Sequence, residues 1–266
     1  MIKITAPGLV IREQSIGESD RLITVLTAQY GLVRAFSRGA KKTKSKKLAA
    51  TALLAYSDFT FVKTRDAYSV EDALVKEVFF ELRQDVEKMV MDRVAQIPEE
   101  ERRSALILAN YNASGISAAG TTFGRYWLAT IGAENVALEL TQKVAPVSLE
   151  QIYAWDPEYI FLNSFSAFTA EDLMTNNAIA GHDWSGLTAV QNGHVYKMPL
   201  GMYYWFAPCS DSPLALQWLA KHLYPEQFTD IDMDAEIKDY FKEFYGVTLS
   251  DEDLHTLYNP PAESAM

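Results

Sequence analysis

A short basic segment gives the first indication of chemistry in this sequence. Residues 37–47 read SRGAKKTKSKK, although the chain of 266 residues has a formal net charge of −11. Clustered ammonium and guanidinium groups bind phosphates and displace their counterions, so one reading is a clamp for a nucleic-acid strand. The other reading is a solvated loop whose charge keeps a sheet edge from associating. The positive residues of the segment are Arg38, Lys41, Lys42, Lys44, Lys46 and Lys47.

The neighbourhood of the segment favours the nucleic-acid reading. Residues 1–70 contain 12 Lys/Arg against 5 Asp/Glu, a net charge of +7. Aromatic side chains on the same stretch could stack on bases, although core packing is the expected role of Phe59 and Phe61. The other two aromatic candidates are Tyr56 and Tyr68, and four arginines on or beside predicted strands join the candidate set: Arg12, Arg21, Arg34 and Arg65.

The strands that carry these basic and aromatic residues are predicted to form a small barrel. Five segments are rich in branched apolar residues and bounded by turn residues, which is typical of strands. Five short strands with one long polar connection fit a closed, all-β, OB-type barrel. The basic segment then connects the third strand to the fourth on the surface. The expected strands are residues 8–12, 21–27, 31–37, 52–63 and 67–70.

Residues 8–46, GLVIREQSIGESDRLITVLTAQYGLVRAFSRGAKKTKSK, resemble the start of RecO, the bacterial recombination mediator. The likeness covers about a third of the chain and implies an OB-fold that binds single- and double-stranded DNA. RecO-like proteins continue with a helical domain, often with a cysteine cluster for metal, and this chain does not, so annealing and recombinase loading are not carried over. The features that carry the likeness are GESDR (17–21), YG (30–31), GAKK (39–42) and FFELR (79–83).

From about residue 85 the pattern changes to α/β. Alternating helices and strands imply a parallel sheet covered by helices. Residues 89–266 have a net charge of −15 and hold all five tryptophans. We therefore predict two domains, 1–84 and 85–266, with a connecting helix at 84–97. Further helices are expected at 121–132, 148–155, 212–224, 234–246 and 250–258, strands at 105–111 and 158–163, and a helix, turn and strand within 186–199.

This second part resembles the C-terminal lobe of the substrate-binding proteins of importers for iron siderophores, haem and cobalamin. In that family two lobes joined by a long helix trap the ligand between them. Here the resemblance implies the joining helix and second lobe, with the RecO-like barrel in place of the first lobe, as in a chimera. The likeness rests on GTTFG (120–124), GAENVA (132–137), VSLEQI (147–152), DP (156–157), GHVY (193–196) and SPL (212–214) leading to Trp218.

The family resemblance nominates cleft and docking residues. Loops after strand ends would form one wall of a cleft for an iron complex, haem or cobalamin, and consecutive aromatics in such a loop suit a planar ligand. The alternative is that those aromatics close over the edge of their own lobe, and ligand contact is the favoured interpretation for Tyr204 and Trp205. Glu150 stands where a family member docks on its permease, which requires export, and it equally suits a helix N-terminus as a dipole-complementing carboxylate. The cleft candidates are Asn163, His182, Trp184, Tyr204 and Trp205.

Other kinds of function find no support in the sequence. The four histidines and the lone Cys209 have no metal-ligand spacing, and no catalytic constellation is evident, so we expect no enzyme, no cofactor and no metal. We read GISAAG (115–120) as turn sequence because it misses the nucleophile-elbow spacing. No apolar run suits a signal peptide or a membrane span, and we expect a cytoplasmic protein without membrane insertion.

The sequence therefore predicts a non-enzymatic binding chain. The first hypothesis is weak, salt-dependent and sequence-independent DNA binding by the barrel. The second is a substrate-binding protein whose first lobe has been exchanged. A fusion in which neither activity is intact is the third.

Overall fold

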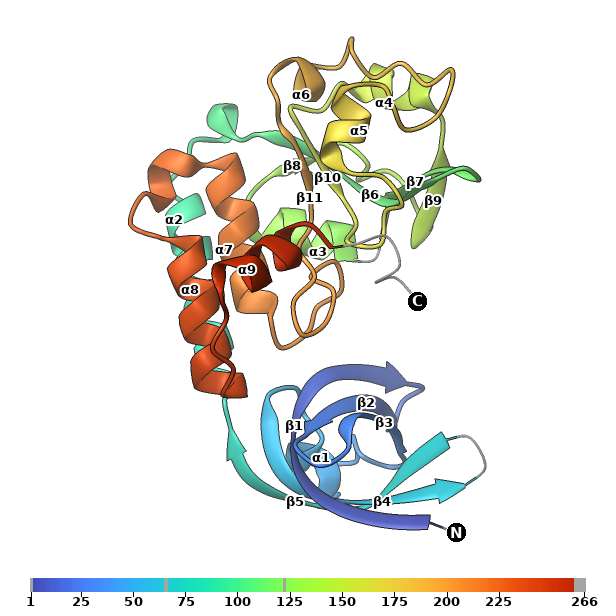
Figure 1. Ribbon diagram of the computed structural model, residues 1–266, viewed down its shortest axis with the longest axis vertical. Coiled ribbons are helices and arrows are strands. Elements are labelled where there is room, and N and C mark those ends of the chain that lie inside the picture. The colour runs from blue at the N-terminus through green and yellow to red at the C-terminus, as the bar shows by residue number, and fades with distance from the viewer. Residues whose placement is uncertain (1, 65–66, 122, 261–266) are drawn as a thin grey trace. The chain divides into compact units, whose positions relative to one another are not determined.

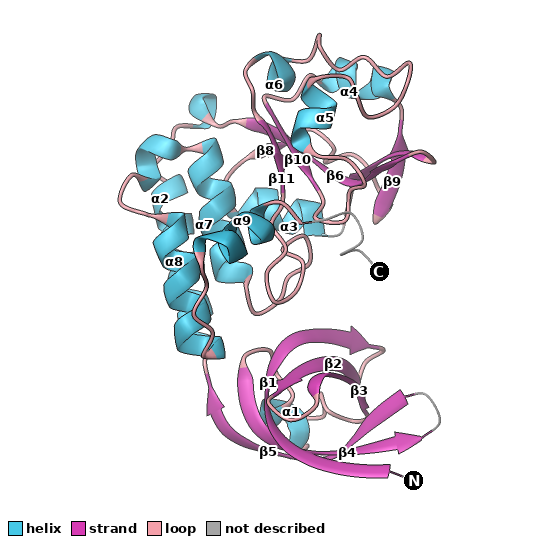
Figure 2. Cartoon of the chain, in the orientation of Figure 1, coloured by secondary structure: helices cyan, strands magenta, loops and turns pink. Residues whose placement is uncertain are grey.

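The computed structural model describes residues 2–64, 67–121 and 123–260. It divides into two units, one comprising Met1–Asp85 with Pro208–Ser212 and the other Val86–Ala207 with Pro213–Met266. Each unit has its own sheet, and among the described residues no strand of one unit pairs with a strand of the other (Figure 2). The two strand sets are therefore independent hydrogen-bonded bodies.

The first unit is a closed five-stranded barrel in the order β1-β2-β3-β5-β4 (Figure 1). Strands β3 and β5 pair in parallel, and the other neighbours are antiparallel. This closed Greek-key arrangement confirms the OB-type barrel. A short helix α1 (Lys47–Ala50) lies between β3 and β4. The strands are β1 (Ile2–Ile16), β2 (Asp20–Thr27), β3 (Gly31–Ser37), β4 (Ala55–Thr64) and β5 (Ala67–Val78).

Alternation along the strands separates the barrel core from its surface. Every second residue of β2 is buried, so the residues between them face outward. Phe59 and Phe61 are fully buried and stack with ring centroids 5.2 Å apart, which confirms their expected core role. Tyr56 and Tyr68 are only half-buried. The two phenylalanines are therefore not available to stack on bases.

The second unit contains a six-stranded sheet in the order β11-β10-β6-β7-β9, with β8 also paired to β6. Strands β11, β10 and β6 are parallel, as expected, whereas β7 runs antiparallel to both of its neighbours. The sheet is thus mixed. Its strands are β6 (Ser104–Asn112), β7 (Gly115–Ala119), β8 (Glu134–Asn135), β9 (Val144–Val147), β10 (Tyr159–Leu162) and β11 (Val195–Lys197).

A tight hairpin causes this departure from the expected parallel sheet. Asn112 pairs with Gly115, and the Asn112 side chain accepts a hydrogen bond from the Ser114 N–H at 2.8 Å, which closes an Asx turn. Gly115 has φ +135°, a conformation that favours glycine. The chain returns at once as β7, with Ile116 and Ala118 buried. Residues 115–119 are therefore a strand, and our interpretation of 115–120 as turn sequence was wrong.

Helices cover both faces of this sheet. Ile160 packs in one cluster with Ile152 of α4 and Leu173 of α5, whereas the ring of Phe161 meets Trp218 of α7 at 5.8 Å on the other face. No described helix is long and apolar enough to cross a membrane. The helices are α2 (Phe80–Val94), α3 (Phe123–Thr130), α4 (Leu149–Trp155), α5 (Ala170–Met174), α6 (Thr188–Gln191), α7 (Ser212–Leu223), α8 (Met233–Tyr240) and α9 (Asp251–Tyr258).

Candidate nucleic-acid interface

The basic segment forms the predicted surface connection between β3 and α1. Among the described residues, none of its six cations lies within 4 Å of a carboxylate oxygen. Lys41 and Lys47 are half-buried, and the Nζ of Lys47 donates to the Val70 carbonyl at 3.4 Å. The other four, Arg38, Lys42, Lys44 and Lys46, are exposed. These charges are available to a phosphate strand.

The root of the segment is anchored to the start of β2. The N–H of Gly39 donates to Asp20 Oδ1 at 2.7 Å, and the N–H of Lys41 donates to the Ser19 carbonyl at 2.9 Å. Gly39 has φ +64°, and Ala40 beside it is fully buried. The hydrogen bond from Gly39, assisted by Ser19 and by nearby positive charge, lowers the pKa of Asp20 below its ordinary value. The segment is thus held at its base while Lys42, Lys44 and Lys46 remain exposed.

Two arginines flank one threonine on the outer face of β1, β2 and β3. Arg12 is opposite Thr24, and Thr24 is opposite Arg34. Since directly opposed Cβ atoms lie about 5 Å apart, the two arginines stand about 10 Å apart across three strands. Phe36 lies two residues after Arg34 on β3, so its side chain is on the same outer face, and it is half-buried. It is opposite Leu22 of β2. We missed Phe36 as a stacking candidate, although the two-residue spacing from Arg34 was a usable signal.

Arg21 has a structural role, so we withdraw it from the nucleic-acid set. It is only 9% exposed, and its Nε lies 2.7 Å from Glu13 Oε1. Its Nη1 donates to the Leu48 carbonyl at 2.5 Å and to Thr51 Oγ1 at 3.1 Å. These bonds fasten α1 and the turn after it to the barrel. Arg65, also nominated, lies outside the described residues.

Three of the predicted cleft residues belong to the interior of the second unit. Trp184 is fully buried, and its indole N–H donates to Tyr111 Oη at 3.0 Å. Trp205 is fully buried and packs edge-to-face on Trp218 at 6.4 Å. Asn163 is 5% exposed, and its amide donates to the Ala109 carbonyl at 2.9 Å. Their assignment to a ligand wall was wrong, because packing and hydrogen bonding already occupy these side chains.

The other two cleft candidates remain partly accessible. The His182 ring stacks on Tyr111 with centroids 6.0 Å apart. The Tyr204 ring meets Phe165 at 4.1 Å, and its hydroxyl accepts a hydrogen bond from Tyr203 Oη at 2.8 Å. Both side chains are half-buried. They lie in aromatic clusters of their own unit, and their contact with a ligand stays a prediction.

Removal of the Tyr111 hydroxyl is expected to destabilise the second unit. Tyr111 is 1% exposed, so in Tyr111→Phe the indole N–H of Trp184 stays buried without an acceptor. We expect a loss of about 1–2 kcal/mol of unfolding free energy. Urea denaturation followed by tryptophan fluorescence measures it, because all five tryptophans follow residue 88. Tyr153→Phe is the control: it removes a hydroxyl that donates to the Asp183 carbonyl at 2.8 Å and accepts from the Gly186 N–H at 3.2 Å, but Tyr153 is 37% exposed, so water can replace these bonds and the loss should be smaller. Equal stability of both variants would contradict the assignment.

Glu150 lies exposed in the first turn of α4. Ser148 caps this helix by accepting from the Gln151 N–H at 3.2 Å. Hydrogen bonds from the backbone N–H of Glu150 and from the Ser148 hydroxyl lower the pKa of the Glu150 carboxyl. The helix-terminus reading of Glu150 therefore has structural support, while permease docking stays a prediction.

The two parts of the chain match different family models. Residues 1–79 match the family model described as "Recombination protein O N terminal", and residues 77–200 match the one described as "Periplasmic binding protein". The first part is similar to the DNA repair protein RecO of Acetivibrio thermocellus, with 36% identity over 106 residues that cover 38% of this chain and 42% of that protein. These matches confirm the two resemblances.

The second part is similar to solved binding proteins. The periplasmic solute binding protein of Veillonella parvula has 29% sequence identity and a TM-score of 0.61, covering 67% of this chain and 53% of that one. The molybdate-binding protein MolA of Haemophilus influenzae is 26% identical over 245 residues, which cover 92% of this chain and 61% of MolA. The chain thus spans about two fifths of the RecO relative and about half of the solved binding protein.

Together the fold and the matches define a chain that joins a RecO-like OB barrel to a periplasmic-binding-protein-like lobe. The barrel carries the exposed cations of the basic segment. The lobe carries the acidic charge and the aromatic core.

Proposed function

We propose that this chain is a non-enzymatic binding protein whose barrel binds single- or double-stranded DNA without sequence preference, in the cytoplasm. The observation that supports it is the anchored basic segment with exposed, unpaired cations. The arginine row of Arg12 and Arg34 extends the positive surface over the barrel face. Phosphate contacts of this kind carry no base information, so the binding follows charge and not sequence.

Fluorescence anisotropy with a labelled single-stranded oligonucleotide tests this proposal on the full chain. If all six cations of the basic segment reach phosphates, log K falls with log salt with a slope of about −4. Two oligonucleotides of unrelated sequence should bind alike. Binding that is absent at low salt, or that does not respond to salt, would reject the proposal.

We expect the hydrogen bond that Asp20 Oδ1 accepts from the Gly39 N–H to strengthen DNA binding, because it holds the basic segment in place. Asp20→Asn and Asp20→Ala both remove a negative charge near the strand, but only alanine removes the acceptor for the Gly39 N–H. We expect Asp20→Ala to bind DNA about threefold more weakly than Asp20→Asn, the size expected from one lost hydrogen bond. Anisotropy titrations of the two variants provide the measurement, and equal affinities would show that the anchor is irrelevant to binding.

The pH dependence of this anchor follows from the lowered pKa of Asp20. A carboxyl group whose pKa is lower in the folded state than its ordinary value of about 3.9 stabilises the folded state at pH values above 3.9. This stabilisation disappears as the pH falls through the folded-state pKa. Protection of the Gly39 amide, corrected for intrinsic exchange, should therefore be constant from pH 8 to pH 5 and decline only below pH 4. Loss of protection near pH 6 would contradict this.

The lobe has the fold of proteins that bind small ligands, but it supplies only one wall of a cleft between two lobes. Three of the residues expected in that wall are buried in the lobe itself. We therefore propose that this chain binds iron complexes, haem, cobalamin or molybdate weakly or not at all. Calorimetry with haem, cobalamin, a ferric siderophore and molybdate tests this, and tight one-to-one binding of any of them would make the importer-type function the better proposal.

A further inference from the structure

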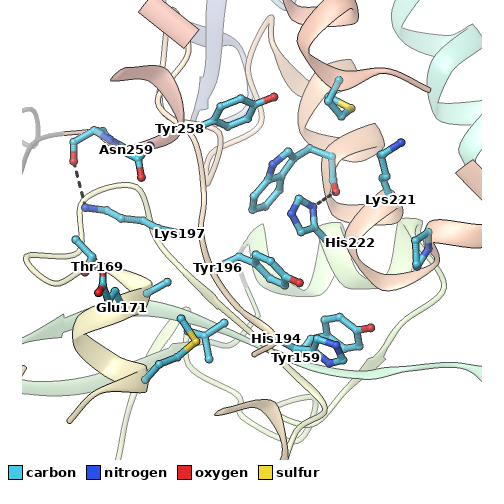
Figure 3. A pocket seen from close by; sticks show the side chains of 17 residues that line it. Tyr159, Thr169, Glu171, His194, Tyr196, Lys197, Lys221, His222, Tyr258 and Asn259 are labelled. Atoms are coloured by element: carbon cyan, nitrogen blue, oxygen red, sulfur yellow. Dashed lines mark hydrogen bonds between the residues drawn. The ribbon is translucent and has the colours of Figure 1, made fainter. Parts of the chain in front are cut away.

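A slot of about 800 Å³ runs along the outer edge of β11, within the second unit (Figure 3). This volume is in the range of small-molecule sites. The slot is bordered by α5 on one side and by α7 on the other, and Tyr258 and Asn259 lie at one end. None of its lining residues was nominated from the sequence as a ligand contact.

The floor of the slot is the free edge of a strand. The N–H of Ile160 donates to the His194 carbonyl at 3.0 Å, and the N–H of Met198 donates to the Leu162 carbonyl at 2.8 Å. Since the residues of a parallel strand alternate in direction, the N–H and C=O groups of Val195 and Lys197 point away from β10. Within the part of the chain that the structure describes, these groups have no backbone partner on that side.

The walls on either side of this edge are mostly apolar and aromatic, and Glu171, exposed on α5, is the one carboxylate among the lining residues. Val195 packs with Ala170 and Met174 of α5, whereas Tyr196 lies on the opposite face, where its ring meets His222 at 4.2 Å. His222 also packs on Trp218 at 4.3 Å. The His222 Nδ1 lies 2.7 Å from the Trp218 carbonyl, which can only accept, so Nδ1 carries the proton. Burial lowers the pKa of His222, and its ring is therefore neutral at neutral pH.

The two lysines at the slot are engaged by the chain. Lys197 Nζ donates to the Ser166 carbonyl at 2.9 Å and to the Pro260 carbonyl at 3.4 Å. Lys221 Nζ donates to the carbonyls of Phe228 and Ile231. The ammonium groups thus fasten loops at the ends of the slot. The donors and acceptors of the strand edge are therefore left for a ligand, together with the His194 ring and the exposed Glu171 carboxylate at the border of the slot.

We propose that this slot binds a flat, neutral heteroaromatic ring that carries a hydrogen-bond donor beside an acceptor on one edge, as purines and pterins do. The Lys197 N–H would donate to the acceptor of the ring, and the Val195 carbonyl would accept from its donor. The ring would lie in the plane of the sheet, with Met174 on one face and the His222 and Trp218 side on the other. Aromatic walls and a small number of placed polar groups are the usual composition of such sites.

Nuclear magnetic resonance on the full chain labelled with ¹⁵N-lysine tests the proposal directly. The Lys197 amide signal is assigned by its loss in Lys197→Arg. Adenosine, guanosine and pterin are then added separately at millimolar concentration. We expect at least one of them to shift the Lys197 amide while the amides of Lys42, Lys44 and Lys46 stay in place. An unshifted Lys197 amide with all three probes would overturn the proposal.

A pair of variants at one position isolates the backbone donor. Lys197→Pro removes the outward N–H, which lies outside the β10 ladder, whereas Lys197→Ala removes the side chain and keeps the N–H. We expect Lys197→Pro to bind the probe about tenfold more weakly than Lys197→Ala, with circular dichroism showing both folded. If both variants are folded and have equal affinities, the site is rejected. If Lys197→Pro does not fold, the amide shift of the unmodified chain is the deciding test.

This site is independent of the DNA-binding proposal. Neutralisation of Lys42, Lys44 and Lys46 should leave the probe affinity unchanged, whatever it does to DNA binding. A parallel loss of probe binding in that variant would show that the probes bind the barrel and would overturn the assignment to the slot.

Discussion

Replacement of Lys42, Lys44 and Lys46 by glutamine is expected to lower the affinity of the full chain for a single-stranded oligonucleotide by about a hundredfold in 0.1 M salt. All three side chains are exposed, and among the described residues none has a carboxylate within 4 Å. Each phosphate neutralised on a single strand contributes about 0.7 to the salt slope, so three contribute about two powers of ten at this salt concentration. Anisotropy titrations between 0.05 and 0.3 M salt measure both the affinity and the slope.

A control with the same charge change separates the basic segment from the net charge of the chain. Lys88, Lys143 and Lys242 are also exposed and lie in the second unit. Their replacement by glutamine should leave the slope as it is and change the affinity by less than about threefold, because these lysines are not part of the segment proposed to contact phosphates and only phosphate contacts contribute to the slope. Equal losses in the two triple variants would mean that the segment is not the binding site.

Replacement of Arg21 by methionine is expected to unfold the barrel more readily without removing a DNA contact. The Arg21 and Glu13 side chains are 11% and 23% exposed and pair at 2.7 Å. Removal of one partner from a buried pair costs about 3–5 kcal/mol, and the residual exposure of Glu13 places this case near 3 kcal/mol. Because the barrel contains no tryptophan, hydrogen exchange followed by mass spectrometry on peptides of β2 and β4 is the suitable measurement.

The partner of Arg21 provides the control. In the double variant Arg21→Met with Glu13→Gln the unpaired charge is gone, so exchange of β2 and β4 should be slower than in the single variant. Glu13 also accepts from the Leu53 N–H at 3.0 Å, which glutamine can keep. At a temperature where the barrel stays folded, DNA affinity should be nearly that of the unmodified chain. A sharp loss of DNA binding in a stable Arg21→Met barrel would return Arg21 to the interface.

The fold of the barrel could be predicted from the sequence because the patterns of apolar and charged residues that indicate it are local. Alternation of apolar residues predicted the strands, and a run of charge without apolar periodicity predicted an exposed connection. The same alternation could have shown that Arg21 is not an interface residue. It lies two and four residues before Ile23 and Val25 on β2 and therefore faces inward with them. An arginine at an inward position indicates a buried partner. That partner, Glu13, lies on the neighbouring strand and follows only from the register.

The lobe was harder to predict from the sequence, because the features in which its structure differs from the prediction depend on tertiary contacts. The burial of Trp184 requires Tyr111 as a hydrogen-bond acceptor, and 73 residues separate the two along the chain. β7 consists largely of small residues, which give weak strand signals. The slot beside β11 could not be predicted, since it depends on which edge of the sheet is left open and on which helices border it.

Closure of the barrel has a consequence for how such chains arise. In the order β1-β2-β3-β5-β4 every strand has two neighbours, and the Ile11 carbonyl of β1 also accepts a hydrogen bond from the Ser210 N–H at 2.9 Å. A closed barrel therefore offers no open sheet edge to a new host, although a transferred copy would lose the segment Pro208–Ser212 that belongs to the same unit here. The sheet of the lobe ends at β11 and β9, so the lobe is the part that keeps open sheet edges at which a host segment could pair.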